Sequence, residues 1–277
     1  MKRFNTFTLA VASMVLSITA MSAGLAGALE INNGLAPPNP QNVIDAGLGV
    51  NVAVRDSLSG DPTEVELVDG GRLWDYFQVY DSSSIVISGG LVHSVGANGD
   101  VYARDFSTIT MSGGHVWDDL RAYDSAEILM SGGAVGGELT AGDSATVTMS
   151  GGWVDLLASQ QQSDIRLTGG AIGNGGILAF HESNIVIVGM NFAVDGNPVG
   201  YGPLAQTDGI LTGTLLSGDT LGDQFCHSGS TACYGSVQSG LITLVPEPST
   251  ASLLGLGLIG MCLTRRRVPH TSGVRCA

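Results

Sequence analysis

Residues 108–133 read TITMSGGHVWDDLRAYDSAEILMSGG, and within this stretch the phrase MSGG occurs twice, once from Met111 and again from Met130. Paired glycines, or a remnant of the pair, recur along much of the chain. They begin at residues 70, 89, 113, 132, 151, 169 and 189. A period of about 20 residues is typical of a stacked repeat array, in which each repeat contacts its neighbours, and not of a globule with one central core.

Apolar residues keep a constant distance from these glycines. Four residues before the first glycine stand Ile85, Ile109, Ile128, Val147, Ile165 and Ile185, and two residues before it stand Ile87, Met111, Met130, Met149, Leu167 and Ile187. The positions between them include threonine and arginine, so one face of each segment is apolar, as in a half-buried strand. Two further apolar positions per repeat, one after the diglycine and one before an Asp-Ser turn, indicate three short strands per coil.

The same composition excludes a helical repeat. Paired glycines and many serine, threonine, isoleucine and valine residues disfavour helices, but they suit strands that are separated by tight turns. The glycines supply positive φ angles and leave room at a corner. We predict an all-β fold, a parallel β-helix of about seven coils over residues 29–190, right-handed by the usual crossover rule. Residues 42–71 are interpreted as an irregular first coil, and residues 191–245 as a β cap that covers the open end.

The N-terminal residues 1–28 have the pattern of a cleavable secretory signal. Two basic residues precede an apolar run, and small residues close the segment at Ala26-Gly27-Ala28. Cleavage after Ala28 starts the mature chain at Leu29. A lone membrane anchor is the alternative, and it is disfavoured because serine and threonine interrupt the apolar run.

A second hydrophobic segment, Ala251–Leu263, lies near the other end of the chain. It follows Pro246-Glu247-Pro248 and precedes Arg265-Arg266-Arg267. The string VPEPSTASLLGLGLIGMCLTRRR resembles the PEP-CTERM sorting signal, in which a Pro-Glu-Pro motif, a membrane segment and an arginine cluster are recognised by an exosortase. We expect a short hydrophobic helix that inserts transiently in the inner membrane, within a signal at residues 246–267 and before a tail at residues 268–277. An ordinary C-terminal anchor is the alternative.

This resemblance implies a protein that is exported and tethered to the membrane until an exosortase processes it. The cell surface or the extracellular polysaccharide is then the expected destination. The part between the two signals, residues 29–245, carries 24 acidic residues against five arginines and no lysine, a formal charge of −19. Such a surface repels phosphate backbones, which excludes nucleic acid as a partner.

Cys226 and Cys233 are the two cysteines of this exported part. An oxidising compartment favours a disulfide between them, which would close the small loop HSGSTA. Free thiols are the alternative. Such a disulfide would stabilise one loop only.

An aspartate stands eight residues before a diglycine in four coils, at Asp81, Asp105, Asp124 and Asp143. Stacking places these like charges about 5 Å apart. The favoured interpretation is that each side chain caps its own turn by accepting backbone N–H groups. A calcium ladder is the alternative, and no other cofactor is expected.

His115, Asp118 and Asp119 form the best candidate for catalysis, because a carboxylate pair can supply general acid and base chemistry at a glycosidic bond. The cluster occurs in one coil only, so an exposed corner is the favoured interpretation.

Three tryptophans, Trp74, Trp117 and Trp153, follow diglycines. Their rings can stack on sugars or pack at corners, and the sequence favours neither interpretation. The function that we predict is non-enzymatic: a surface- or matrix-associated, adhesin-like protein that presents weak contacts along a rod, with extracellular polysaccharide as a partner. A polysaccharide lyase or hydrolase is the alternative.

Overall fold

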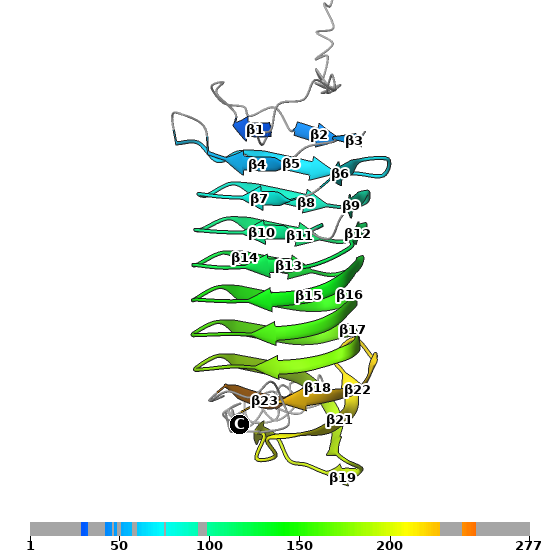
Figure 1. Ribbon diagram of the computed structural model, residues 1–277. Coiled ribbons are helices and arrows are strands. Elements are labelled where there is room, and N and C mark those ends of the chain that lie inside the picture. Colours follow the sequence, from blue (N-terminus) through cyan, green and yellow to red (C-terminus); the bar gives the residue numbers. More distant parts are fainter. Residues whose placement is uncertain are drawn as a thin grey trace, which may run out of the picture. The chain divides into compact units, whose positions relative to one another are not determined.

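The computed structural model describes residues 29–32, 42–45, 47–48, 51–56, 60–74, 76–93, 99–227 and 240–247. The chain divides into two compact units, Met1–Val245 and Pro246–Ala277. The first unit is a stack of parallel β coils, about seven in number, which confirms the predicted all-β solenoid (Figure 1). The predicted secretory signal, the hydrophobic helix at residues 251–263 and the tail lie outside the described residues. In the described part of the chain, no helix is long and apolar enough to cross a membrane.

Three stacks of short strands build the coils, as the three apolar positions per repeat predict. The first stack contains β1 (Leu29–Asn32), β4 (Val52–Arg55), β7 (Phe77–Val79), β10 (Val101–Ala103) and β13 (Leu120–Ala122). The second contains β2 (Asn42–Ile44), β5 (Glu64–Leu67), β8 (Ser84–Ile87), β11 (Thr108–Met111), β14 (Glu127–Met130) and β18 (Asn184–Val194). The third contains β3 (Gly47–Leu48), β6 (Arg72–Trp74), β9 (Leu91–His93) and β12 (His115–Val116).

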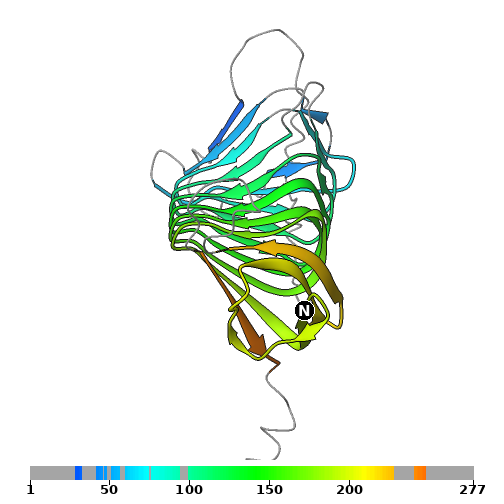
Figure 2. The ribbon, with the colours of Figure 1, turned by 60° about the horizontal axis from the view of Figure 1, so that its bottom comes forward.

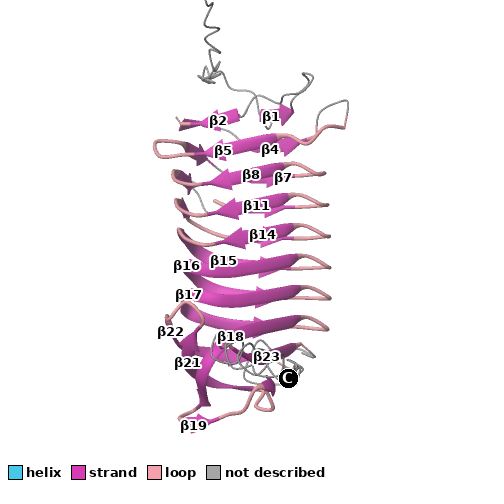
Figure 3. Cartoon of the chain, turned by 180° about the vertical axis from the view of Figure 1, so that it is seen from behind, coloured by secondary structure: helices cyan, strands magenta, loops and turns pink. Residues whose placement is uncertain are grey.

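In the later coils the strands are longer and run around corners. These are β15 (Ala134–Ala141), β16 (Thr146–Ser159) and β17 (Asp164–Ala179), and register shifts mark the corners within β16. The turns between the first and second stacks lie above one another along one edge (Figure 3). With the C-terminal end turned forward, the strands curve around a common interior (Figure 2).

The predicted apolar columns are the core. Ile109 lies beside Ile85 and Ile128 in neighbouring coils, and Met130 lies beside Met111 and Met149. Each of these six side chains is at most 1% exposed. Because neighbouring strands lie about 4.8 Å apart, equal side chains at equal repeat positions contact one another directly. The handedness of the solenoid stays a prediction.

The diglycines form tight corners, as the sequence predicts, and the two glycines of a pair have different roles there. A Cβ on Gly132 would lie 2.4 Å from the carbonyl oxygen of Ser112 in the preceding coil. Gly133 has a φ of 82°, which favours glycine. The first glycine therefore permits close stacking, and the second permits the bend.

Residues 42–71, predicted as one irregular coil, contain strands of two coils: β2 and β3 belong to the first, and β4 and β5 to the second, which is more regular than predicted. Val65 lies beside Ile85 and Leu67 beside Ile87, so this coil is in phase with the later ones. The insertion between β4 and β5 conceals the phase in the sequence, because it shifts the preceding valines relative to the glycines. β1 completes the first coil with β2 and β3, and it begins at Leu29, directly after the predicted cleavage site.

Beyond β18 the pairing becomes antiparallel. The strands there are β19 (Asn197–Pro198), β20 (Gly202–Pro203), β21 (Asp208–Leu215), β22 (Thr220–Cys226) and β23 (Leu241–Pro246). β21 pairs with β18 and β22, and β22 also continues the stack by pairing with β17 at Ile177 and Leu178. These strands cover the edge of the last parallel coil. Cys226 is disulfide-bonded. Cys233 lies outside the described residues, so the predicted pairing with Cys233 stays a prediction.

Candidate functional site

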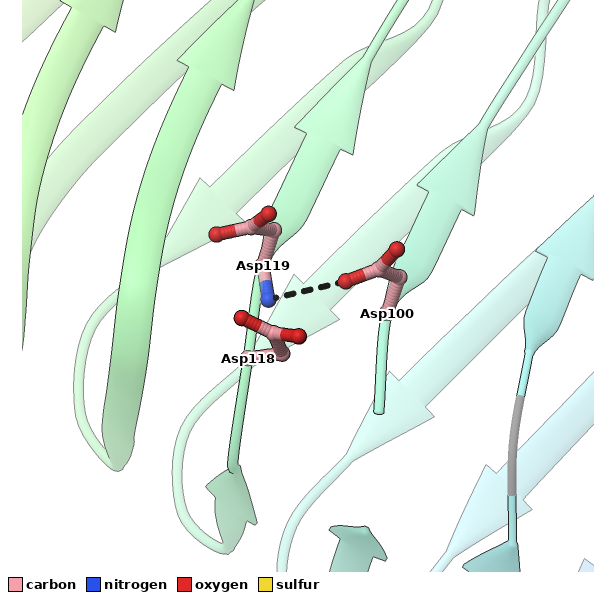
Figure 4. Close-up of side chains that lie close together, drawn as sticks. All are labelled: Asp100, Asp118 and Asp119. Atoms are coloured by element: carbon pink, nitrogen blue, oxygen red, sulfur yellow. Dashed lines mark hydrogen bonds between the residues drawn. The ribbon is translucent and has the colours of Figure 1, made fainter. Parts of the chain in front are cut away.

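Three carboxylates meet at one corner of the solenoid. Asp100 precedes β10, and Asp118 and Asp119 precede β13 in the next coil. One oxygen from each lies within 4.8 Å of the others, the one such group among the described residues (Figure 4). The structure therefore brings the predicted pair together and adds a third acid from the coil before it.

Most of the oxygens in this acidic corner already have protein donors. The backbone N–H of Asp119 donates to Oδ1 of Asp100 at 3.3 Å, which is the dashed line in Figure 4. The hydroxyl of Tyr102 donates to Oδ2 of Asp100 at 2.8 Å. The backbone N–H of Glu138 donates to Oδ1 of Asp119 at 2.6 Å, and Arg121 pairs with Oδ2 of Asp119. Both carboxylates are thus used in holding three coils together.

The pKa values follow from these contacts. Burial, and then the negative charges of Asp119 and Asp100, raise the pKa of Asp118 above its usual value. Burial, and then the hydrogen bond to Asp100, raise the pKa of Tyr102 to about 12. Burial acts to lower the pKa of Arg121. The nearby Asp119, Tyr123, Tyr102 and Glu138 outweigh this effect and raise the pKa overall. Arg121 therefore stays positively charged and offsets part of the negative charge of the corner.

Asp118 differs from its neighbour. Within the described part of the chain its carboxylate accepts no hydrogen bond, whereas Asp119 is 9% exposed and accepts two. His115 is not part of the acidic corner. Its ring stacks on Trp117 at 5.4 Å between centroids, on the outer surface of β12.

Sequence reasoning missed Asp100, Tyr102, Arg121 and Glu138. The signal was the repeat itself, since Asp100, Asp119 and Glu138 occupy the same position in successive coils and each donor N–H follows from that stacking. Arg121 pairs with Glu138 at 3.4 Å as well as with Asp119. Among the described residues these are the two ion pairs.

The aspartates of the predicted turn column do lie at the turns, with left-handed φ angles. Asp81, Asp105, Asp124 and Asp143 have φ between 53° and 60°, and Gln161 and His181 continue the series. The prediction that each caps its own turn is wrong. The carboxylate of Asp124 accepts from the backbone N–H of Asp105, and that of Asp143 accepts from Asp124, each at 3.2 Å. Stacking of the turns makes the neighbouring coil's N–H the closer donor.

Tyrosines and arginines alternate beside these turns. The Arg104 guanidinium lies 5.4 Å from the centroid of Tyr102 and 5.3 Å from that of Tyr123. Arg55 lies 3.9 Å from the ring centroid of Tyr80. These cation–π contacts stabilise exposed coil surfaces. Each guanidinium group also covers the face of the tyrosine ring that it contacts.

The predicted sorting motif follows the solenoid directly. Pro246 ends β23 and Glu247 is the last described residue, so Pro248 and the arginines at 265–267 lie outside the described residues. Residues 244–267 match the family model described as the PEP-CTERM protein-sorting motif. The chain carries a PEP-CTERM sorting signal. No curated protein and no solved structure matches the chain.

The PEP-CTERM signal has a direct consequence for the route of this protein. It implies an exported protein that is held at the membrane, processed by an exosortase and then released. The β-helical body is consistent with a PEP-CTERM protein. The match covers the sorting signal and not the body.

Proposed function

We propose that this protein is a structural, adhesin-like component of the cell surface or extracellular matrix, delivered there by the PEP-CTERM route. The observation that carries the proposal is the sorting motif at residues 244–267, joined to a body of stacked coils. Repeated coils present similar surfaces at regular intervals, and weak contacts repeated along a rigid body add to a high avidity.

The acidic corner supports a non-enzymatic role. General acid and base chemistry needs carboxylates that can exchange protons with substrate. The oxygens of Asp100 and Asp119 are bound by backbone N–H groups, Tyr102 and Arg121. A role in coil-to-coil bonding accounts for them without a substrate.

A polysaccharide lyase or hydrolase is the second candidate. It is favoured by the raised pKa of Asp118 next to Asp119, since glycosidases pair a carboxyl group of raised pKa with a second carboxylate. Incubation of the purified protein with neutral and acidic polysaccharides tests this function. New reducing ends or unsaturated uronates, lost in Asp118→Asn, would establish it and would overturn the non-enzymatic proposal.

Delivery is tested in producing cells by fractionation and by mass spectrometry of the C-terminus. We expect the native protein in the surface or matrix fraction with residues after the motif removed. Replacement of Pro246, Glu247 and Pro248 by alanine should leave the full-length chain in the membrane fraction. Arg275→Ala, outside the matched residues 244–267, is the matched control and should behave as the native protein. Native protein that keeps its C-terminus and stays in the cytoplasm would contradict the proposal.

A further inference from the structure

Two large aromatic side chains are exposed on the outer surface of the third strand stack. Trp117 is 53% exposed and Trp153 is 39% exposed. Trp117 follows β12, and Trp153 lies in β16, two coils further along the solenoid. An indole ring contributes much apolar area, and exposure of two on one face is a feature that the packing of the coils does not require.

The coil between the two tryptophans has almost no side chains on this face. Ala134 lies between His115 and Trp153 in the strand register. Gly136 lies against the backbone of Trp117, since a Cβ there would be 2.2 Å from the carbonyl oxygen of Trp117. We call His115, Trp117, Ala134, Gly136 and Trp153 the tryptophan face. It presents two indoles that lie about 10 Å apart along the solenoid axis, which is two strand spacings. The strip between them, at Ala134 and Gly136, carries only small side chains or none.

Neighbouring side chains hold the indole of Trp117 in place. His115 stacks on Trp117 with an interplanar angle of 16°, and His93 meets Trp117 edge-on at 4.7 Å between centroids. Trp153 extends over Gly173, whose added Cβ would lie 3.0 Å from Cζ2 of the indole. Rigid aromatic groups bind at a low entropic cost. Tyr102 and Tyr123 offer no comparable surface, because Arg104 lies over both rings.

The charge of the body restricts the ligand. With a formal −19 over residues 29–245 and no lysine, the surface repels anionic glycans as it repels nucleic acid. The arginine nearest the acidic corner, Arg121, is paired with Asp119 and Glu138. Asp118 directly follows Trp117 and accepts no hydrogen bond within the described part of the chain, so it can accept one from a hydroxyl group.

We infer that the tryptophan face binds a neutral, hydroxyl-rich polysaccharide, whose apolar ring faces lie on Trp117 and Trp153 and whose hydroxyls donate to Asp118. The inference rests on the proposed function, which places the protein among extracellular polysaccharides. A chain that runs along the solenoid axis would contact both indoles, because the intervening coil leaves room above Ala134 and Gly136.

The test uses the protein as recovered from producing cells and measures its retardation in native gels that contain soluble β-glucan, amylose, alginate or chitosan. We expect retardation by at least one of the neutral glucans and none by alginate. Trp117→Ala and Trp153→Ala should each weaken binding about 3- to 10-fold, the effect of one aromatic contact. Trp153→Tyr should keep most of the affinity, since it keeps an aromatic ring.

Two further variants separate binding from folding. Phe106→Ala removes an aromatic side chain that is 73% exposed at a turn, and it should bind as the native protein does. Ala134→Gln keeps both tryptophans but fills the strip between them, and it should weaken binding at an unchanged melting temperature. The inference would be overturned if the double variant Trp117→Ala, Trp153→Ala bound with native affinity. It would also be overturned if the native protein bound alginate or chitosan and neither neutral glucan.

The outcomes also separate this inference from the proposed function. If the processed protein is found at the cell surface but none of the neutral glucans retards it, the inference about the tryptophan face is overturned and the proposed function stands. Glucan binding by a protein that cells retain unprocessed would overturn the proposed function and support the tryptophan face.

Discussion

Asp118 and Asp119 show how much the fold changes two identical neighbours. Asp119 is nearly buried and is held by Arg121 and by the N–H of Glu138, so its charge is compensated. Asp118 has no such partner among the described residues, and its pKa is raised by burial and by the neighbouring acids. A raised carboxyl pKa means that ionisation of Asp118 opposes folding.

Asp118→Asn should therefore stabilise the protein at pH 7, by about 0.5 kcal/mol in view of the partial exposure of the site. The folded protein binds the proton more tightly than the unfolded chain, so native stability falls as pH rises from the ordinary carboxyl pKa of 3.8 through the raised one. The gain from asparagine should vanish below that window. Thermal melting from pH 3 to pH 7 measures it.

Asp119→Asn is the matched control and should act in the opposite direction. It removes the charge that Arg121 pairs with, and we expect a loss of about 1–3 kcal/mol at pH 7. Equal destabilisation by both asparagine variants at pH 7 would refute the distinction between the two aspartates.

At the scale of elements, the turn column shows that one residue type serves two needs at once. Aspartate tolerates the left-handed backbone of the turn better than most residues. Its carboxylate also accepts the N–H of the aspartate in the neighbouring coil, as in the pair Asp105 and Asp124. Backbone amides thereby offset the repulsion within the column, which is the role that calcium has in the alternative interpretation.

Asp124→Ala should cost about 1–2 kcal/mol, because alanine is strained at a φ of 60° and leaves the N–H of Asp105 without its acceptor. Asp124→Asn keeps an acceptor oxygen and removes one charge, so we expect a change within about 0.5 kcal/mol. Thermal melting with and without calcium is the measurement. We expect no effect of calcium, and a calcium-dependent rise in melting temperature that Asp124→Asn abolishes would establish a calcium ladder instead.

At the scale of the whole body, each coil is bonded to the coils before and after it. The coil of β1, β2 and β3 has one such partner among the described strands, the coil of β4, β5 and β6. The other end is covered by β21 and β22, which pair with β18 and β17. Stability in such a stack is close to a sum of terms between neighbours, so the two ends should differ.

Amide hydrogen exchange, followed by mass spectrometry, should show this difference. We expect the slowest exchange in β14 and in the parts of β16 and β17 that pair with neighbours on both sides, and the fastest in β1, β2 and β3. Deletion of the strands that cover the C-terminal end should accelerate exchange in β18 and leave β8 unchanged. Uniform exchange along the solenoid would contradict a stack of nearest-neighbour contacts.

The fold was predictable because a solenoid has a local rule. Each coil repeats one pattern, and Ile109, Ile128 and Val147 must contact once the period is known. The sorting signal was predictable for the same reason, since it is a contiguous stretch at residues 244–267. The phase of the coil of β4, β5 and β6 was mispredicted because an insertion separates β4 from β5, and only stacking against β8 restores the register.

The period and the alternation of apolar residues, which the sequence contains by itself, determined the architecture, the columns of the core and the place of the turns at Asp81, Asp105, Asp124 and Asp143. Only the tertiary structure decided which donor each surface carboxylate meets. The reason is physical: a strand's inward contacts follow from its own period, whereas the distance from Asp119 to Asp100 and to the N–H of Glu138, or from Asp124 to the N–H of Asp105, depends on how adjacent coils are offset. Side-chain roles at the corners are therefore properties of the stack and not of any one coil.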